Sequence, residues 1–228
     1  MSVENNYSIY RIVSLTSFAV IFVGIALHCV RYHPKLDEVF GKERRLRILD
    51  GLRILVYLLT LPLPQQRLSP LSKFRKLVYL LAVLCFAALV VTGFYPTLIL
   101  GKSISSYWLI LHTAAGGVFV CALPVLVCFW AENCRFNENL WHSIQKFVHQ
   151  EAVNKSSCEG CGPGQKIAFW LIVILALPLI LSIILSMFPL FGTDVQIFLL
   201  LTHRYCALLF ALVIAVHTYL LVLARMKK

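Results

Sequence analysis

The chain has 228 residues, of which 60% are hydrophobic and only 14% are charged, and its formal net charge is +11. Its mean hydropathy of +0.82 is that of an integral membrane protein, which excludes an ordinary soluble enzyme. The basic residues gather at the ends of apolar segments, as they do on the cytoplasmic flanks of membrane helices, so the positive charge does not indicate nucleic-acid binding.

The first predicted transmembrane span covers about residues 9–30 and ends at Arg31. The segment that follows is strongly basic. Within it, residues 46–61 have apolar side chains at helical spacing and charged side chains on the other faces. This pattern favours an amphipathic helix lying in the membrane interface over a further span.

Four more apolar segments follow, at about residues 77–100, 107–130, 167–188 and 193–224, and each is long enough to cross a bilayer. The sequence therefore predicts an all-α integral membrane bundle with five transmembrane helices. We expect three parts: an amino-terminal transmembrane helix (1–35), a basic cytoplasmic segment with an interfacial helix (36–76) and a four-helix domain (77–228).

Lysine and arginine are distributed unevenly between the predicted loops. Residues 31–76, 131–166 and 225–228 hold eleven, four and three of the 21 basic residues. The remaining three are Arg11, Lys102 and Arg204. Because cytoplasmic loops are enriched in Lys and Arg, we expect the amino terminus outside and the carboxyl terminus in the cytoplasm, in a bacterial cytoplasmic membrane.

The last predicted helix carries His203 and His217, fourteen residues apart. At about 1.5 Å per residue they are separated by roughly 21 Å and share one helix face, which puts one ring in each leaflet. In the expected topology His112 lies in the outer leaflet with His203, and His28 lies in the inner leaflet with His217. Two neutral imidazoles from facing helices can supply both axial ligands of a haem iron.

We therefore expect His112 and His203 to bind an outer haem b. Gly116 and Gly117, one turn after His112, would let a macrocycle approach the backbone closely. The alternative interpretation is that the histidines are hydrogen-bonded core residues and that the glycines serve only helix packing.

Three motifs are shared with a known family. They are Gly164-Gln165-Lys166 followed by Phe169-Trp170, Leu-Leu-Thr-His203 with His217-Thr-Tyr-Leu, and Leu-Ile-Leu-His112-Thr-Ala-Ala-Gly116. Over about residues 75–224 the chain resembles the b-type cytochrome subunits of membrane-bound formate dehydrogenases, thiosulfate reductases and nickel-iron hydrogenases. The resemblance implies a four-helix bundle with two b haems that passes electrons between an iron–sulfur or multihaem partner subunit and a quinone.

By this resemblance His217 is one ligand of an inner haem. The second inner ligand is expected fourteen residues before Gly93, but Tyr79 occupies that position. An inner haem is therefore absent, five-coordinate or ligated from elsewhere, and His28, at a similar expected depth, is the candidate substitute. The alternative is that His28 only caps the interface and that His217 is hydrogen-bonded or binds a quinone.

The resemblance also implies a quinone site at the loop that opens the fourth span, with Gly164, Gln165 and Lys166. A glutamine amide can donate to a quinone carbonyl, and a lysine can stabilise negative charge on the reduced ring. In the alternative interpretation these residues form a helix-entry turn, and Lys166 extends its ammonium group toward the headgroups.

Three cysteines lie in the loop before the fourth span, where Cys134 precedes the pair Cys158 and Cys161. With His142 or His149 these thiols could hold zinc or contact a partner, but free thiols are ordinary in a cytoplasmic loop.

The leading interpretation of the whole chain is an electron-transfer membrane subunit. A haem-free anchor or assembly subunit is the alternative, and a transporter is disfavoured because intramembrane acidic residues are lacking.

Overall fold

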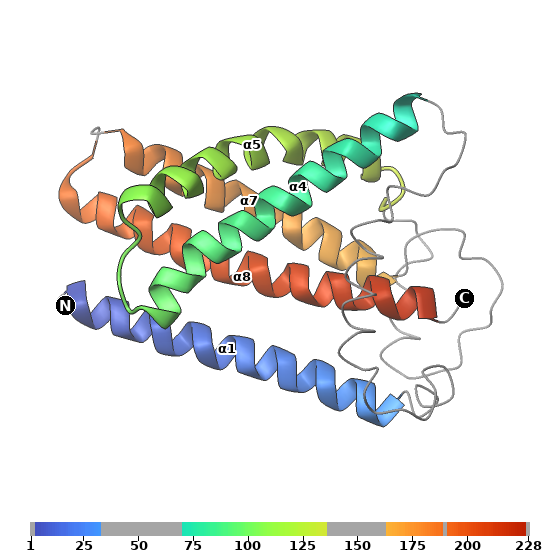
Figure 1. Cartoon of the computed structure of the whole chain (residues 1–228), viewed down its shortest axis with the longest axis horizontal. Helices are drawn as coiled ribbons and strands as arrows, with labels where there is room; N and C mark the ends of the chain where they lie inside the picture. The colour runs from blue at the N-terminus through green and yellow to red at the C-terminus, as the bar shows by residue number, and fades with distance from the viewer. Residues whose placement is uncertain (1–2, 33–69, 136–162, 189–190, 227–228) are drawn as a thin grey trace. The chain divides into compact units, whose positions relative to one another are not determined.

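The structure, a computed structural model, describes residues 3–32, 70–135, 163–188 and 191–226 (Figure 1). The described residues form α-helices and one π-helix: α1 (Val3–Tyr32), α4 (Pro70–Phe94), η1 (Tyr95–Ile99), α5 (Ser106–Trp130), α7 (Pro163–Met187) and α8 (Thr193–Met226). Among the described residues, five helical segments are long and apolar enough to cross a membrane. This confirms the predicted all-α membrane bundle.

Three helices begin earlier than the hydropathy pattern predicts, α1 at Val3 and two others at a proline. α4 begins at Pro70 and α7 at Pro163, in each case with a proline in the first turn. Proline is favoured there because the first helical N–H groups have no acceptor within the helix and its φ angle already suits the helix. Gly164, Gln165 and Lys166, expected in a loop, are therefore in the first turns of α7. The expected interfacial helix at residues 46–61 lies outside the described residues.

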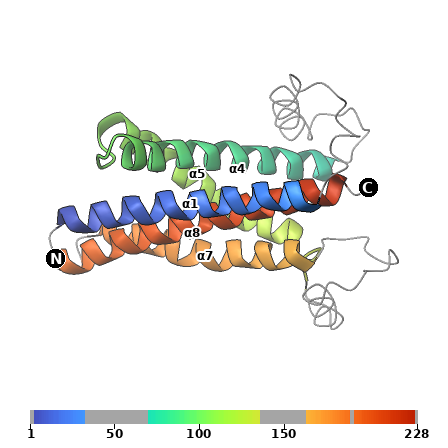
Figure 2. The ribbon, with the colours of Figure 1, turned by 90° about the horizontal axis from the view of Figure 1, so that it is seen from below.

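The contacts of the chain define two compact units, residues 1–18 with 127–228, and residues 19–126. In the first unit α7 and α8 lie side by side and antiparallel (Figures 1 and 2). The close approach depends on small residues: a Cβ on Gly164 would lie 3.3 Å from a methyl carbon of Leu220. Ala168 and Ala176, further along α7, are buried. Small residues at such spacing allow membrane helices to pack backbone to backbone.

The start of α1 belongs to the same unit and packs on α8 through aromatic side chains. The Tyr10 ring meets the Tyr205 ring edge-on at 5.3 Å, and the Tyr10 hydroxyl donates to the Arg204 carbonyl at 3.3 Å. The Arg204 guanidinium lies 5.4 Å from the centre of the Tyr7 ring. A cation on an aromatic face is a favourable way to hold an arginine inside an apolar span.

In the second unit α4 and α5 are antiparallel and meet along matched positions. A Cβ on Gly116 would lie 3.8 Å from Leu89, and the rings of Phe86 and Phe119 are 6.2 Å apart. The next contact along this register is between Gly93 and His112. The α4–α5 interface therefore positions His112 against α4.

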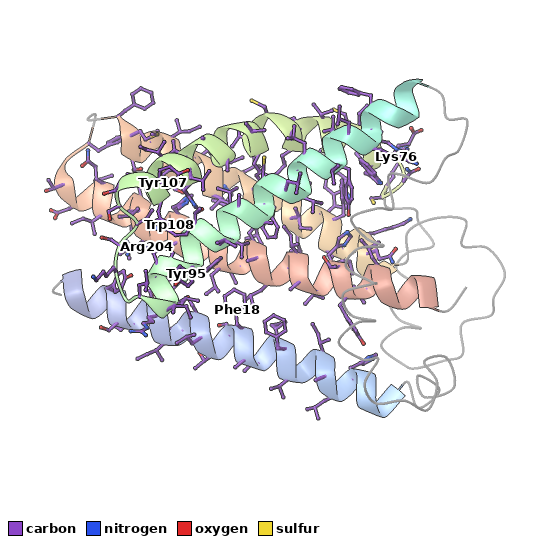
Figure 3. All side chains as sticks on the ribbon, in the orientation of Figure 1. Phe18, Lys76, Tyr95, Tyr107, Trp108 and Arg204 are labelled. Atoms are coloured by element: carbon purple, nitrogen blue, oxygen red, sulfur yellow. The ribbon has the colours of Figure 1, made fainter. Side chains whose placement is uncertain are left out.

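The turn between these helices begins with the π-helix η1, which the sequence pattern did not predict. Pro96 has no N–H to donate, and the Thr97 hydroxyl bonds to the Gly93 carbonyl at 2.8 Å. Gly101, with φ of 64°, then reverses the chain in a conformation that favours glycine. Figure 3 shows Tyr95 and Trp108 at this turn, with ring centres 6.0 Å apart.

Candidate functional site

His112 lies on α5 with its ring Nδ1 atom 2.8 Å from the hydroxyl oxygen of Thr92 on α4. The same hydroxyl is 2.7 Å from the carbonyl oxygen of Ala88, one turn earlier on α4. Thr92 is 1% exposed, so both bonds are shielded from solvent. The three groups form a short hydrogen-bonded chain from the α4 backbone to the His112 ring.

The direction of these bonds follows from the number of protons. A hydroxyl has one proton, and a carbonyl oxygen can only accept. Thr92 therefore donates to Ala88 and accepts from Nδ1–H of His112. In a neutral imidazole with its proton on Nδ1, the lone pair that can bind a metal is on Nε2.

The backbone of Gly93, on α4, also contacts the His112 ring. A Cβ at this position would lie 3.2 Å from Cε1 and 3.7 Å from Nδ1 of His112. The first distance is tighter than nine in ten real Cβ contacts, so the ring sits against the bare backbone of α4. A side chain at position 93 would displace the ring by a few tenths of an ångström.

His203, on α8, has a comparable arrangement with a different partner. Its Nδ1 atom is 3.0 Å from the carbonyl oxygen of Leu179 on α7. Because a carbonyl only accepts, Nδ1 carries the proton and the lone pair is again on Nε2. The Ser182 hydroxyl donates to the same carbonyl at 3.1 Å.

His217, on the same helix as His203, differs. Its Nδ1 atom is buried, and within the described residues it has no hydrogen-bond partner. His28, proposed from the sequence as its companion, is on α1 with an exposed side chain, and Tyr79 on α4 is 40% exposed. His28 and Tyr79 belong to the unit of residues 19–126 and His217 to the other, so a shared iron stays a prediction.

The first turns of α7 link it to its neighbours. Gln165 is 8% exposed and donates from Nε2 to the Leu220 carbonyl on α8 at 3.2 Å, three residues after His217. Lys166 donates from Nζ to the Arg135 carbonyl at 3.1 Å. The Trp170 indole N–H donates to the Cys134 carbonyl at 3.0 Å. Each of the three side chains therefore has a structural contact that the sequence did not reveal.

A family model described as prokaryotic cytochrome b561 matches residues 72–228, which is more than half of the chain. The chain belongs to this family. It is a membrane b-type cytochrome of electron transfer that binds haem b, and the predicted resemblance to hydrogenase and formate dehydrogenase cytochromes b is confirmed. No curated protein and no solved structure matches the chain. The matched residues include α4 to α8 of this cytochrome but not α1.

The His112 ring and the His203 ring each have surroundings that suit a haem ligand, and because the two residues belong to different units, a shared iron stays a prediction for them too. An imidazole binds iron through an unprotonated nitrogen, and metal-binding histidines nearly always donate their other ring N–H to an oxygen acceptor. Both rings have that acceptor, the Thr92 hydroxyl for one and the Leu179 carbonyl for the other. A haem needs only two such side chains, so it is compatible with the finding that the described residues contain no cluster of three or more His, Cys, Asp or Glu.

Sequence reasoning missed Thr92 and Leu179 as partners of the two rings. Thr92 had a signal, since a hydroxyl beside Gly93 inside an apolar span needs an acceptor or a donor. The Leu179 carbonyl had none, because every residue carries a carbonyl. Cys158, Cys161, His142 and His149 lie outside the described residues, and Cys134 is buried.

Proposed function

We propose that this cytochrome is the membrane subunit that passes electrons between a partner oxidoreductase and the quinone pool. In this proposal His112 and His203 are the two axial ligands of one b haem. The supporting observation is the pair of Nδ1 hydrogen bonds, to Thr92 and to the Leu179 carbonyl, which leave the Nε2 lone pair of each ring suited to iron.

A bound haem supplies one-electron redox chemistry, and the chain supplies the rest. His112 and His203 would hold the haem through their Nε2 atoms, and a haem held by two imidazoles would serve electron transfer. The hydrogen bonds to Thr92 and to the Leu179 carbonyl hold both rings in one tautomer.

A second, inner haem held by His217 and His28 is the less supported part of the proposal. The buried Nδ1 of His217, without a partner among the described residues, is a polar atom whose burial is unfavourable unless something satisfies it. If His217 and His28 ligate an inner haem, the purified protein contains two haems per chain. If a single haem is present and neither residue affects it, there is no inner haem.

We assign quinone binding to the first turns of α7, with Gly164, Gln165 and Lys166. The buried amide of Gln165 and the ammonium group of Lys166 offer donors of the kind that a quinone carbonyl needs. An iron–sulfur or multihaem subunit is the proposed partner. Gln165→Leu should slow oxidation of the reduced haem by added quinone, while Gln196→Leu, in the first turn of α8, should not. Equal rates in both variants contradict the assignment.

The proposed orientation puts the amino terminus outside and the carboxyl terminus in the cytoplasm of a bacterial cytoplasmic membrane. It rests on the uneven distribution of basic residues. A reporter fused after Lys228 should be cytoplasmic, and one inserted at Lys102 should be external. A reporter read on the opposite side in either fusion overturns the assignment of His112 and His203 to the outer leaflet.

The central experiment compares oxidised and dithionite-reduced absorbance spectra of the purified chain and counts haem per chain. The unmutated protein should contain haem b, and His112→Ala and His203→Ala should each lose one haem. His142→Ala, a histidine outside all five predicted spans, is the control and should keep the parent haem content. A haem-free parent protein indicates the alternative function, an anchor or assembly subunit.

A further inference from the structure

We propose that Thr92 is a positioning residue for the His112 imidazole and that its hydroxyl sets the reduction potential of the haem that His112 holds. The inference rests on the proposed role of His112 as an axial ligand. It goes beyond that role because it assigns control of the potential to a side chain that does not touch the iron.

The geometry around Thr92 leaves its hydroxyl little freedom. The bond to the Ala88 carbonyl at 2.7 Å uses its proton, which makes the oxygen an obligatory acceptor toward His112. Thr113, the residue after His112, makes the same kind of bond to the carbonyl of Leu109 at 2.8 Å, but its side chain is exposed. Thr92 is therefore placed to act on the ring, and Thr113 is its matched control.

The hydrogen bond has an electronic consequence for the ligand. When Nδ1–H donates to an acceptor, electron density moves toward Nε2 and the ring becomes a more basic ligand. A more basic ligand favours ferric over ferrous iron, which lowers the reduction potential. Removal of the Thr92 hydroxyl should therefore raise the potential.

The bond also orients the ring. The imidazole lies against the backbone of Gly93 on α4, and Thr92 on the same helix holds its Nδ1 atom. His203 differs because its Nδ1 acceptor is a backbone carbonyl, which no side-chain substitution can remove. Of the two Nδ1 acceptors, only the Thr92 hydroxyl can therefore be removed by substituting a side chain.

The test is a redox titration of the purified, haem-loaded full chain. Thr92→Val removes the hydroxyl and keeps the shape of the side chain, and it should retain haem at a raised potential. A tenfold change in the ratio of ferric to ferrous affinity corresponds to about 59 mV for one electron, which is the order of the expected shift. Thr92→Ser restores the hydroxyl and should return the potential to the parent value, and Thr113→Val should not change it.

Three results would overturn the proposal: a parent potential in Thr92→Val, a shift of equal size in Thr92→Ser, or an equal shift in Thr113→Val. If Thr92→Val does not fold, Thr92→Ala carries the same expectation and the same contrary result. The ligand assignment has its own readout. Full haem content in His112→Ala refutes that assignment, whereas haem loss in His112→Ala with an unshifted potential in Thr92→Val refutes only the role of Thr92.

Discussion

His203 and His217 are on the same helix, fourteen residues apart, but their surroundings differ. The ring of His203 donates its Nδ1 proton to the Leu179 carbonyl, whereas the Nδ1 atom of His217 is buried and has no hydrogen-bond partner within the described residues. Periodicity alone predicts equivalent roles for them. The neighbouring helix α7 therefore fixes the Nδ1 proton of His203, and within the described residues nothing does the same for His217.

The largest expected effect comes from removing each histidine in turn. His203→Ala should lose the outer haem completely, because a six-coordinate iron needs both imidazoles. His217→Ala should keep the outer haem, and total haem falls only if an inner haem exists. The measurement is haem per chain by extraction and absorbance. Loss of the outer haem in His217→Ala would erase the contrast between the two residues.

A smaller effect is expected at Gly93, whose backbone contacts the His112 ring as the Leu179 carbonyl contacts the His203 ring. Gly93→Ala places a Cβ 3.2 Å from Cε1 of His112, so the ring must move by a few tenths of an ångström and its bond to Thr92 weakens. We expect haem occupancy to fall by roughly tenfold, the scale of other outer-shell changes.

Gly24→Ala on α1 is the matched control for Gly93→Ala. No atom of the described residues lies within 4 Å of a Cβ placed on Gly24. Both substitutions gain about 1 kcal/mol of intrinsic helix propensity, so only the contact with His112 distinguishes them. Equal haem occupancy in the two variants would show that the ring does not depend on Gly93.

The smallest expected effect concerns α1, whose first turns pack beside His203 through Tyr10 and Arg204. Tyr10→Phe removes the hydroxyl that donates to the Arg204 carbonyl but keeps the ring on Tyr205. The loss should be about 1 kcal/mol of unfolding free energy, and haem content should not change. Thermal unfolding in detergent, followed by the haem spectrum, measures both. Haem loss in this variant would show that α1 supports the His203 ring directly.

The sequence predicted the helices well because the length of an apolar segment is set by the thickness of the bilayer. It predicted His28, His112, His203 and His217 as the membrane histidines for the same reason. It did not predict the π-helix η1, because the widened turn after Gly93 depends on how Pro96 and Thr97 satisfy the local backbone.

The hydrogen-bond partners of the histidines could not be predicted from the sequence, for a different reason. Thr92 contacts His112 only because the register of the antiparallel helices α4 and α5 brings the two residues together. The register of α7 and α8 brings the Leu179 carbonyl to His203 in the same way. Hydropathy predicts that such helices pair but does not give the register of side chains across the interface. The roles of Gln165, Lys166 and Trp170 as links between α7 and its neighbours were missed in the same way.

The most direct test of the ligand assignment is electron paramagnetic resonance of the oxidised protein, combined with rescue by free imidazole. The unmutated protein should give a low-spin ferric signal typical of two imidazole ligands. His112→Gly and His203→Gly should each lose the low-spin signal of the haem that these residues hold and regain it when haem and imidazole are added together, because free imidazole then occupies the space of the missing ring. A low-spin signal per chain as large in either variant without imidazole as in the unmutated protein would contradict ligation by His112 and His203.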